Sequence, residues 1–251
     1  MESKSRNKIV LVSDFGRSGQ GWLSYMLCYI LNAQFIEPYN FLNGKKYSVS
    51  EHILDLTQGN LPNRERTNYS LVVKTHNILR SQIDLTDKII LLVRDPRDVA
   101  VSMQNLVLIN YNKIGWGHPR AKFFLLMEKS FRLLNYIKII LSWKRHYYSW
   151  KKSSYYFVRY EDLLVNCQQV LEKILKYLEI QLDEKIIKEA VENFSFEKIT
   201  GRKRGQEDKG SAEFRRGISG DYKNKFSRFE IKVIDFLFKK LFKELNYETN
   251  S

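Results

Sequence analysis

Cysteine, proline and glycine are scarce in this chain, which has 2, 4 and 12 of them among 251 residues. Cys28 and Cys167 match neither a disulfide framework nor a metal-binding pattern. There is no apolar run of about 18 residues, the length of a transmembrane helix, and no charged-then-apolar leader follows Met1. No internal repeat or low-complexity linker interrupts the chain. We therefore expect a cytoplasmic protein without a transmembrane segment.

The length and the 43% content of hydrophobic residues suit one α/β domain over residues 1–251. Lysine and arginine number 42 against 28 acidic residues, which gives a net charge of +14. Such an excess favours anionic partners, including nucleic acid, acidic lipid and phosphorylated or sulfated molecules. The basic residues are scattered, however, and solvated lysine on helix faces is an alternative source of the charge.

The clearest pattern is a strand, a glycine loop and a helix between residues 9 and 31. Residues 9–12 are apolar and include three β-branched side chains, Gly16, Gly19 and Gly21 follow, and apolar residues from Trp22 to Leu31 recur at helical spacing. A loop of this kind aims backbone N–H groups and the positive end of a helix at one point. The pattern predicts an anion site, to which Arg17 adds further donors.

This loop lacks two residues that nucleotide triphosphatases need. The spacing of Gly16 and Gly21 fits G-x-x-x-x-G-K-[ST], but Trp22 and Leu23 stand in the positions of the lysine and the hydroxyl residue. Without them the site has no lysine for the outer phosphates and no ligand for magnesium, so ATP or GTP chemistry is disfavoured. We expect no bound metal.

Two further predicted strands end in residues that can bind anions. The short strand 71–76 ends with Lys74 and His76, and side chains at such ends face the ligand crevice of a parallel sheet. The apolar strand 88–93 is followed by Arg94. Pro96, flanked by acids, indicates a helix start, and Ser102 lies about two turns into that helix.

The second half of the chain reads as helices around one more strand. We expect two helices within 121–150, a strand at 155–160 with Glu161 and Asp162 as the next helix cap, and helical periodicity at 170–178 and 184–191. Ser195 begins a short helical piece. The polar loop 201–220 is long enough to be a lid. A capping box at Ser227 starts a last helix that ends near Leu245.

Four of these segments, in order, resemble motifs of the PAPS-dependent sulfotransferases; PAPS is 3′-phosphoadenosine 5′-phosphosulfate. Residues 15–23 resemble the 5′-phosphosulfate loop, and residues 93–102 resemble the 3′-phosphate motif. Residues 160–163 match a tyrosine-acid-acid segment, and residues 214–224 resemble the R-K-G-x-x-G-D-W-K-N signature. The resemblance implies a single P-loop-like α/β domain, with a central parallel sheet flanked by helices on both faces.

The resemblance also implies roles for individual residues. The 5′-phosphosulfate would be held by Arg17, Ser18, Gly19, Gln20 and Gly21, the 3′-phosphate by Arg94, Ser102, Arg215, Arg216 and Gly217, and the adenine by Trp22, Tyr160, Ser195 and Phe196. His76 would be the general base, with Lys74 and Arg17 beside the transferred group. The chain departs from the family pattern at four positions of these motifs: Arg17 replaces a lysine, Gln20 and Gly21 replace two threonines, and Tyr222 replaces a tryptophan.

We therefore expect an enzyme that moves a sulfuryl group from PAPS to a hydroxyl of a small molecule or carbohydrate, leaving 3′-phosphoadenosine 5′-phosphate (PAP). A P-loop kinase is the alternative among enzymes, and the missing lysine and hydroxyl argue against it. A basic nucleic-acid-binding module would explain the charge but not two phosphate sites, so no nucleic-acid partner is expected. Residues 34–69 and 110–122 are expected to line the acceptor site. Neither the acceptor nor the oligomeric state follows from the sequence.

Overall fold

The computed structural model describes residues 8–36, 67–77, 86–114, 119–208 and 214–249, with side chains left out for 110–130. These residues belong to two compact units. The first unit combines Met1–Val93 with Ser149–Lys203, and the second combines Arg94–Tyr148 with Arg204–Ser251. The single domain predicted over 1–251 stays a prediction.

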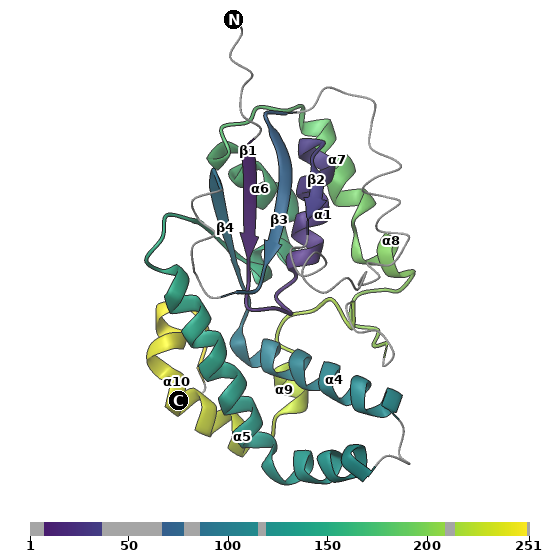
Figure 1. Cartoon of the computed structure of the whole chain (residues 1–251), viewed down its shortest axis with the longest axis vertical. Coiled ribbons are helices and arrows are strands. Elements are labelled where there is room, and N and C mark those ends of the chain that lie inside the picture. The colour runs from purple at the N-terminus through teal and green to yellow at the C-terminus, as the bar shows by residue number, and fades with distance from the viewer. Residues whose placement is uncertain (1–7, 37–66, 78–85, 115–118, 209–213, 250–251) are drawn as a thin grey trace, which may run out of the picture. The chain divides into compact units, whose positions relative to one another are not determined.

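The first unit contains a five-stranded sheet of order β2-β3-β1-β4-β5 (Figure 1). Every neighbouring pair is parallel, and Ser13 at the end of β1 pairs in register with Thr75 of β3. The parallel sheet and the α/β class agree with the sequence prediction. The strands are β1 (Lys8–Ser13), β2 (Gln34–Ile36), β3 (Tyr69–Thr75), β4 (Lys88–Val93) and β5 (Tyr156–Arg159).

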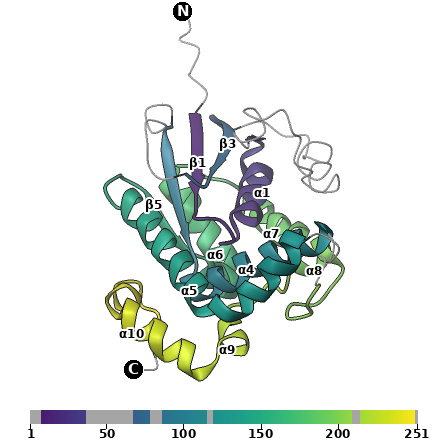
Figure 2. The same ribbon diagram turned by 60° about the horizontal axis from the view of Figure 1, so that its bottom comes forward.

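The central strands are apolar because both of their faces are covered. Residues 10–12 of β1 and 89–93 of β4 are all buried. Helix α1 (Gln20–Leu31) packs on β3 and buries every residue except Gly21 (Figure 2). Helix α7 (Glu184–Asn193) contacts both α1 and α6 (Tyr160–Tyr177), and the short α8 (Phe196–Thr200) follows it. The packing of α1 against β3 and α7 therefore fixes the position of the loop that joins β1 to α1.

The second unit is helical and consists of α4 (Pro96–Ile114), most of α5 (Pro119–Trp150), α9 (Tyr222–Lys225) and α10 (Arg228–Glu244). Phe131 has non-helical angles, so α5 is kinked, in keeping with the two helices predicted there. Helix α10 lies beside α5 (Figure 1), where Arg132 donates to Glu230 at 2.9 and 2.8 Å. The predicted capping box of Ser227 and Glu230 is present.

Most predicted elements are confirmed within a few residues, but the predicted cap of α6 is wrong. Arg159 is its N-cap residue, and Glu161 and Asp162 lie inside the first turn. There they favour the helix through its dipole rather than by capping it. The acceptor walls were predicted at 34–69 and 110–122. Residues 37–66 of the first segment and 115–118 of the second lie outside the described residues.

Within the described ranges, no helix combines the length and the apolar character that crossing a membrane requires.

Candidate nucleotide-binding site

The loop between β1 and α1 bends repeatedly into the left-handed backbone region. Gly16, Arg17 and Gly19 have φ values of 100°, 63° and 91°. Gly19 is the N-cap residue of α1, and a Cβ atom there would lie 2.6 Å from the Tyr160 ring. An arginine with positive φ is uncommon, and such outliers concentrate at functional sites. A left-handed loop before a helix N-terminus is the kind of backbone that binds a phosphate or sulfate group.

Ser18 and Gln20 in this loop form hydrogen bonds within the protein. The Ser18 N–H donates to Asp14 Oδ2 at 3.2 Å. The side-chain amide of Gln20 donates to the Val12 carbonyl and, at 3.1 Å, to the Thr75 carbonyl. Gln20 therefore joins the ends of β1 and β3, and its backbone N–H, rather than its amide, is the group suited to an anion.

Three of the four residues predicted to contact adenine meet beside this loop. The Trp22 indole donates to the Phe194 carbonyl at 2.7 Å, which ties α1 to the residue before Ser195. The rings of Trp22 and Tyr160 are 6.3 Å apart and meet edge to face. Ser195 caps α8, accepting from the Lys198 N–H at 3.3 Å. The fourth residue, Phe196, is buried on α8 beneath the Arg202 guanidinium, 5.5 Å from its ring centre.

Lys74 and His76 lie at the carboxyl end of β3, beside the end of β1. Lys74 pairs in register with Val12 of β1. Nδ1 of His76 lies 2.5 Å from Oδ1 of Asp14, the first residue after β1. The Asp14 side chain is completely buried, whereas that of His76 is 33% exposed. The imidazole is thus accessible while the carboxylate that holds it is not.

In the second unit, Asp98 in the first turn of α4 fastens the segment before α9. Its carboxylate accepts from the Gly220 N–H at 2.7 Å and from the Tyr222 N–H at 2.9 Å. Arg94 donates to the Ile218 carbonyl at 2.9 Å and lies 3.8 Å from the same carboxylate. Burial raises the pKa of Asp98, and the nearby Arg94 charge opposes this effect. These contacts bring Arg94 next to the 215–217 segment.

Arg215 and Arg216 are held by acidic partners. Arg215 is 8% exposed, lies 2.7 Å from Glu207 and also pairs with Asp221. Arg216 is 23% exposed and donates to Asp221 at 2.5 Å and to the Gly205 carbonyl at 3.0 Å. Burial opposes ionisation of Asp221, but hydrogen bonding from Arg215 prevails and lowers the pKa of Asp221. The two guanidinium groups are therefore positioned by charge pairing.

The remaining predicted residues of this unit lie close by in the chain. Ser102 is 6% exposed on α4, and Gly217 has a φ of 62°. Within the predicted lid, the Gly205 N–H donates to the Arg216 carbonyl at 2.8 Å and the Asp208 N–H to the Arg215 carbonyl at 3.3 Å. The two arms of the loop are thus joined to each other, and its role as a lid stays a prediction.

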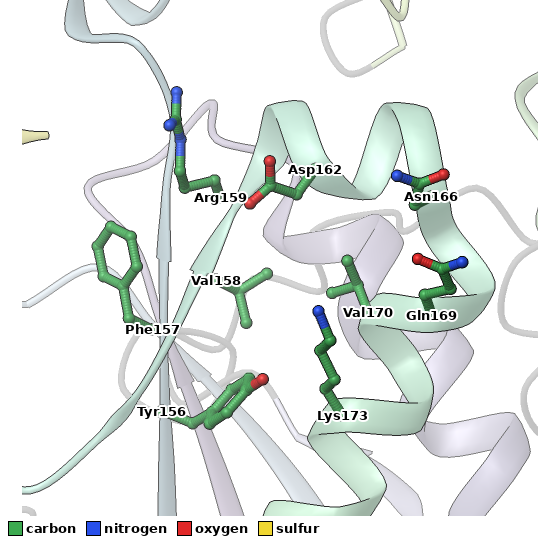
Figure 3. A pocket seen from close by; sticks show the side chains of 9 residues that line it. All are labelled: Tyr156, Phe157, Val158, Arg159, Asp162, Asn166, Gln169, Val170 and Lys173. Carbon is green, nitrogen blue, oxygen red and sulfur yellow. The ribbon is translucent and has the colours of Figure 1, made fainter. Parts of the chain in front are cut away.

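A pocket of about 350 Å³ opens elsewhere, between β5 and α6 (Figure 3). Tyr156 and Val158 from the strand and Asn166 and Lys173 from the helix contribute to its walls. The pocket contains none of the predicted site residues and is separate from the candidate site.

The structure gathers the predicted site residues in two sets, one in each unit. The first set is Arg17, Ser18, Gly19, Gln20, Gly21, Trp22, Lys74, His76, Tyr160, Ser195 and Phe196, and the second is Arg94, Ser102, Arg215, Arg216 and Gly217.

Sequence analysis missed the roles of Asp14 and Asp221. Asp14 directly follows a buried strand, the same signal that pointed to His76. Asp221 stands inside the 214–224 motif, where the carboxylate that orders both arginines was overlooked.

Comparison with known proteins is consistent with these observations. A family described as "Sulfotransferase domain" matches residues 7–246. Sulfotransferase 1B1 of Canis lupus familiaris is 24% identical over 94% of this chain and 84% of its own length. Mouse sulfotransferase SULT7A1, solved in complex with PAP, shares the fold with a TM-score of 0.55 and 21% identity, covering 96% of this chain and 85% of its own. Retinol dehydratase, solved with androsterone and inactive cofactor PAP, also has a TM-score of 0.55, with 18% identity over 98% and 82%.

Proposed function

The chain belongs to the sulfotransferase domain family, and from that premise we propose how its residues transfer a sulfuryl group from PAPS to an acceptor hydroxyl. One observation carries the proposal. The left-handed loop of Gly16, Arg17 and Gly19 and the imidazole of His76 follow the carboxyl ends of two adjacent parallel strands, β1 and β3. The loop proposed as the phosphate cradle and the histidine proposed as the proton acceptor thus lie at neighbouring strand ends of one unit, which supports transfer to a hydroxyl.

The glycine loop suits the 5′-phosphosulfate group. Backbone N–H groups of residues 19–21 and the Arg17 guanidinium would hold this end of PAPS, with Ser18 between them, because the Ser18 N–H itself is bonded to Asp14. Glycine at position 19 suits this loop conformation, because its φ is 91° and a Cβ atom would lie 2.6 Å from the Tyr160 ring. Gln20 would contribute its backbone N–H, since its side chain is bonded to the strands.

The residues of the second set suit the 3′-phosphate. This group would be held by Arg94, Ser102, Arg216 and Gly217, together with the more deeply buried Arg215. The bond from Arg94 to the Ile218 carbonyl supports the assignment, since it places one guanidinium beside the 215–217 segment. Trp22, Tyr160, Ser195 and Phe196 are proposed to contact adenine; the edge-to-face contact of the first two supports a shared aromatic wall.

In the proposed mechanism His76 takes the proton of the attacking hydroxyl. When bound, PAPS supplies a sulfuryl group on a phosphate that leaves with the bonding electron pair. Arg17 and Lys74 offset the negative charge that develops on the transferred oxygens and the leaving phosphate. We propose that no metal is needed, and that activity survives treatment with a chelator.

The acceptor is proposed to be a hydroxyl of a small molecule or carbohydrate, with no nucleic-acid partner. The walls that would select it, within 34–69 and 110–122, lie largely outside the described residues. A cytoplasmic location stays a prediction from the sequence.

Calorimetry with PAP and with Mg-ATP tests the nucleotide assignment. We expect PAP to bind more tightly, because Trp22 and Leu23 occupy the positions of the magnesium and outer-phosphate residues of a triphosphatase loop. Equal or tighter binding of Mg-ATP would favour the kinase alternative. A screen of hydroxyl acceptors with labelled PAPS then identifies the second substrate.

Replacing His76 by alanine tests the proposed base. Turnover should fall by roughly 10²- to 10⁴-fold while PAP affinity stays nearly unchanged. His52 and His118 are predicted to tolerate this replacement better, and because both lie within the proposed acceptor segments, any effect there should appear in the acceptor KM rather than in kcat. His146, also predicted to tolerate replacement, is 3% exposed, so its variant reports on folding as well as on chemistry. Near-normal turnover of the His76 variant would contradict the assignment.

A further inference from the structure

Asp14 has a buried carboxylate that contacts both His76 and the glycine loop. Its Oδ1 lies 2.5 Å from His76 Nδ1, and its Oδ2 accepts the Ser18 N–H of the glycine loop at 3.2 Å. Its own N–H donates to the Thr75 carbonyl at 3.2 Å, which holds the residue at the junction of β1 and β3. Its side chain is completely buried. A buried acid is costly unless its oxygens are hydrogen-bonded, and here one oxygen accepts the Ser18 N–H while the other contacts His76.

We propose that Asp14 is a positioning residue that makes His76 a proton acceptor through Nε2. The proposal rests on the proposed function, in which His76 is the general base. An ionised carboxylate can only accept hydrogen bonds, so the contact at Nδ1 requires a proton on that nitrogen. The neutral imidazole carries one proton, and the lone pair is therefore on Nε2. Asp14 thus selects the tautomer as well as the direction of the ring.

The same contact stabilises the charge that forms during the reaction. The acceptor oxygen forms its bond to sulfur while the bond from sulfur to the phosphate oxygen breaks, and the electron pair leaves with that phosphate. The hydroxyl proton passes to Nε2, which makes His76 an imidazolium ion with protons on both nitrogens. Asp14 then faces that cation at Nδ1 from a site without solvent, where charge pairing is strong. Serine hydrolases use an aspartate in this way to orient and stabilise their histidine.

Asp14 also joins the base to the phosphate cradle. Because its second oxygen holds the Ser18 N–H, the position of the imidazole is tied to the loop that would bind the 5′-phosphosulfate. His76 and the loop can therefore hold a constant separation, which in-line transfer needs. A variant of Asp14 must be tested for both contacts separately.

The decisive variant is Asp14→Asn, which keeps the shape and removes the charge. We expect kcat to fall by roughly 10²- to 10⁴-fold, the range seen when a histidine loses its correct tautomer or general-base function. The KM for PAPS and the affinity for PAP should change less than about threefold, since Arg17 and the other loop N–H groups stay in place. The double variant Asp14→Asn, His76→Ala should be no slower than His76→Ala alone, because the two residues act as a unit.

A second readout is independent of activity. With ¹⁵N-labelled histidine, NMR of the full chain with PAP should show His76 protonated at Nδ1 and bare at Nε2 when neutral. The His76→Ala variant identifies its signals. In Asp14→Asn the signature should shift toward the Nε2-protonated form. The control is Asp87→Asn, whose carboxylate accepts the Ile9 N–H at 2.8 Å at the opposite end of β1; it should leave both kcat and the tautomer unchanged.

The outcomes separate this proposal from the proposed function. If Asp14→Asn keeps its turnover and its Nδ1-protonated histidine while His76→Ala is inactive, Asp14 does not position the base, although His76 remains the base. Weaker PAP binding with unchanged kcat would assign Asp14 to the loop alone and overturn the proposal. A fully active His76→Ala variant would overturn the proposed base itself, whatever the tautomer.

Discussion

The two strand-to-helix corners of this protein are built on different principles. The corner between β1 and α1 is made by the backbone, through left-handed residues at Gly16, Arg17 and Gly19. The corner between β4 and α4 is made by side chains, in which arginines alternate with acids. Backbone N–H groups keep their direction as long as the chain holds its conformation, whereas guanidinium groups need partners that fix them.

The acidic partners of the second corner are structural. Arg97 is 1% exposed and is bonded to Asp95 at 2.7 Å and to Asp235 at 2.8 Å, between the rings of Tyr222 and Phe242. Its neighbour Arg94, by contrast, contacts a backbone carbonyl and lies 3.8 Å from the nearest carboxylate oxygen of Asp98. The comparison teaches that charge alone does not mark a ligand contact. Arg97 is 1% exposed and serves the fold, whereas Arg216 is paired with Asp221 but remains 23% exposed.

The largest effect is expected from Arg97→Met. Removing the guanidinium takes its positive charge away from the buried carboxylates of Asp95 and Asp235, which should cost about 3–5 kcal/mol of unfolding free energy. Urea denaturation followed by circular dichroism measures it. Lys188→Ala, which removes a solvent-exposed pair with Glu184 on α7, is the control and should cost much less. A loss below 1 kcal/mol for Arg97→Met would mean that side-chain pairing does not hold this corner together.

Gly19→Ala should be next, and it tests the backbone corner. With a φ of 91° and a Cβ atom 2.6 Å from the Tyr160 ring, the loop must shift. Strain of about 1–3 kcal/mol corresponds to roughly 5- to 150-fold weaker PAP binding if the shift reaches the cradle. The control is Asn32→Ala, which places alanine at a φ of 52° at the other end of α1. It should lower stability while leaving PAP affinity unchanged in calorimetry.

Arg216→Ala tests whether the corner between β4 and α4 binds the 3′-phosphate while the corner between β1 and α1 binds the 5′ end of the nucleotide. Loss of a charged hydrogen bond, worth about 1.5–3 kcal/mol, should weaken PAP binding roughly 10- to 100-fold. Binding of AMP, which lacks the 3′-phosphate, should hardly change, whereas Gly19→Ala should weaken both nucleotides. Lys232→Ala, on the exposed face of α10, controls for loss of charge. Equal weakening of PAP and AMP by Arg216→Ala would contradict the assignment of the 3′-phosphate.

The smallest expected effect is a loss of stability of helix α10 at acidic pH. Burial opposes ionisation of Glu230, but hydrogen bonds from Arg132 prevail and lower the pKa of Glu230. Its stabilising contribution is therefore complete above the usual glutamate pKa of about 4.3 and is lost as the pH falls below it.

Hydrogen exchange at pH 5 and pH 3, corrected for intrinsic rates, measures this change. Protection should fall more in α10 than in α1, which contains no acidic residue. Glu230→Gln should reduce the difference between the two helices. Equal losses in both helices would show that the Arg132 pair is not its source.

The elements of the fold could be predicted because their signals are local. An apolar run such as 88–93, the glycines before α1 and the Ser227–Glu230 box each specify their own segment, and all three agree with the structure. The cap of α6 was mispredicted because acids in a first turn and acids at an N-cap look alike in a sequence. Backbone angles at Arg159 decide between them.

The sequence by itself determined the residue types of the candidate site, since motif spacing survives without coordinates. Only the tertiary structure decided their partners. The Gln20 amide donates to carbonyls of the strands, Arg215 pairs with two carboxylates, and His76 contacts Asp14. Asp14 and His76 are far apart in the chain and meet only because β1 and β3 are neighbours in a parallel sheet. Side-chain hydrogen bonds act over about 3 Å, and nothing in a linear sequence records which distant residues come that close.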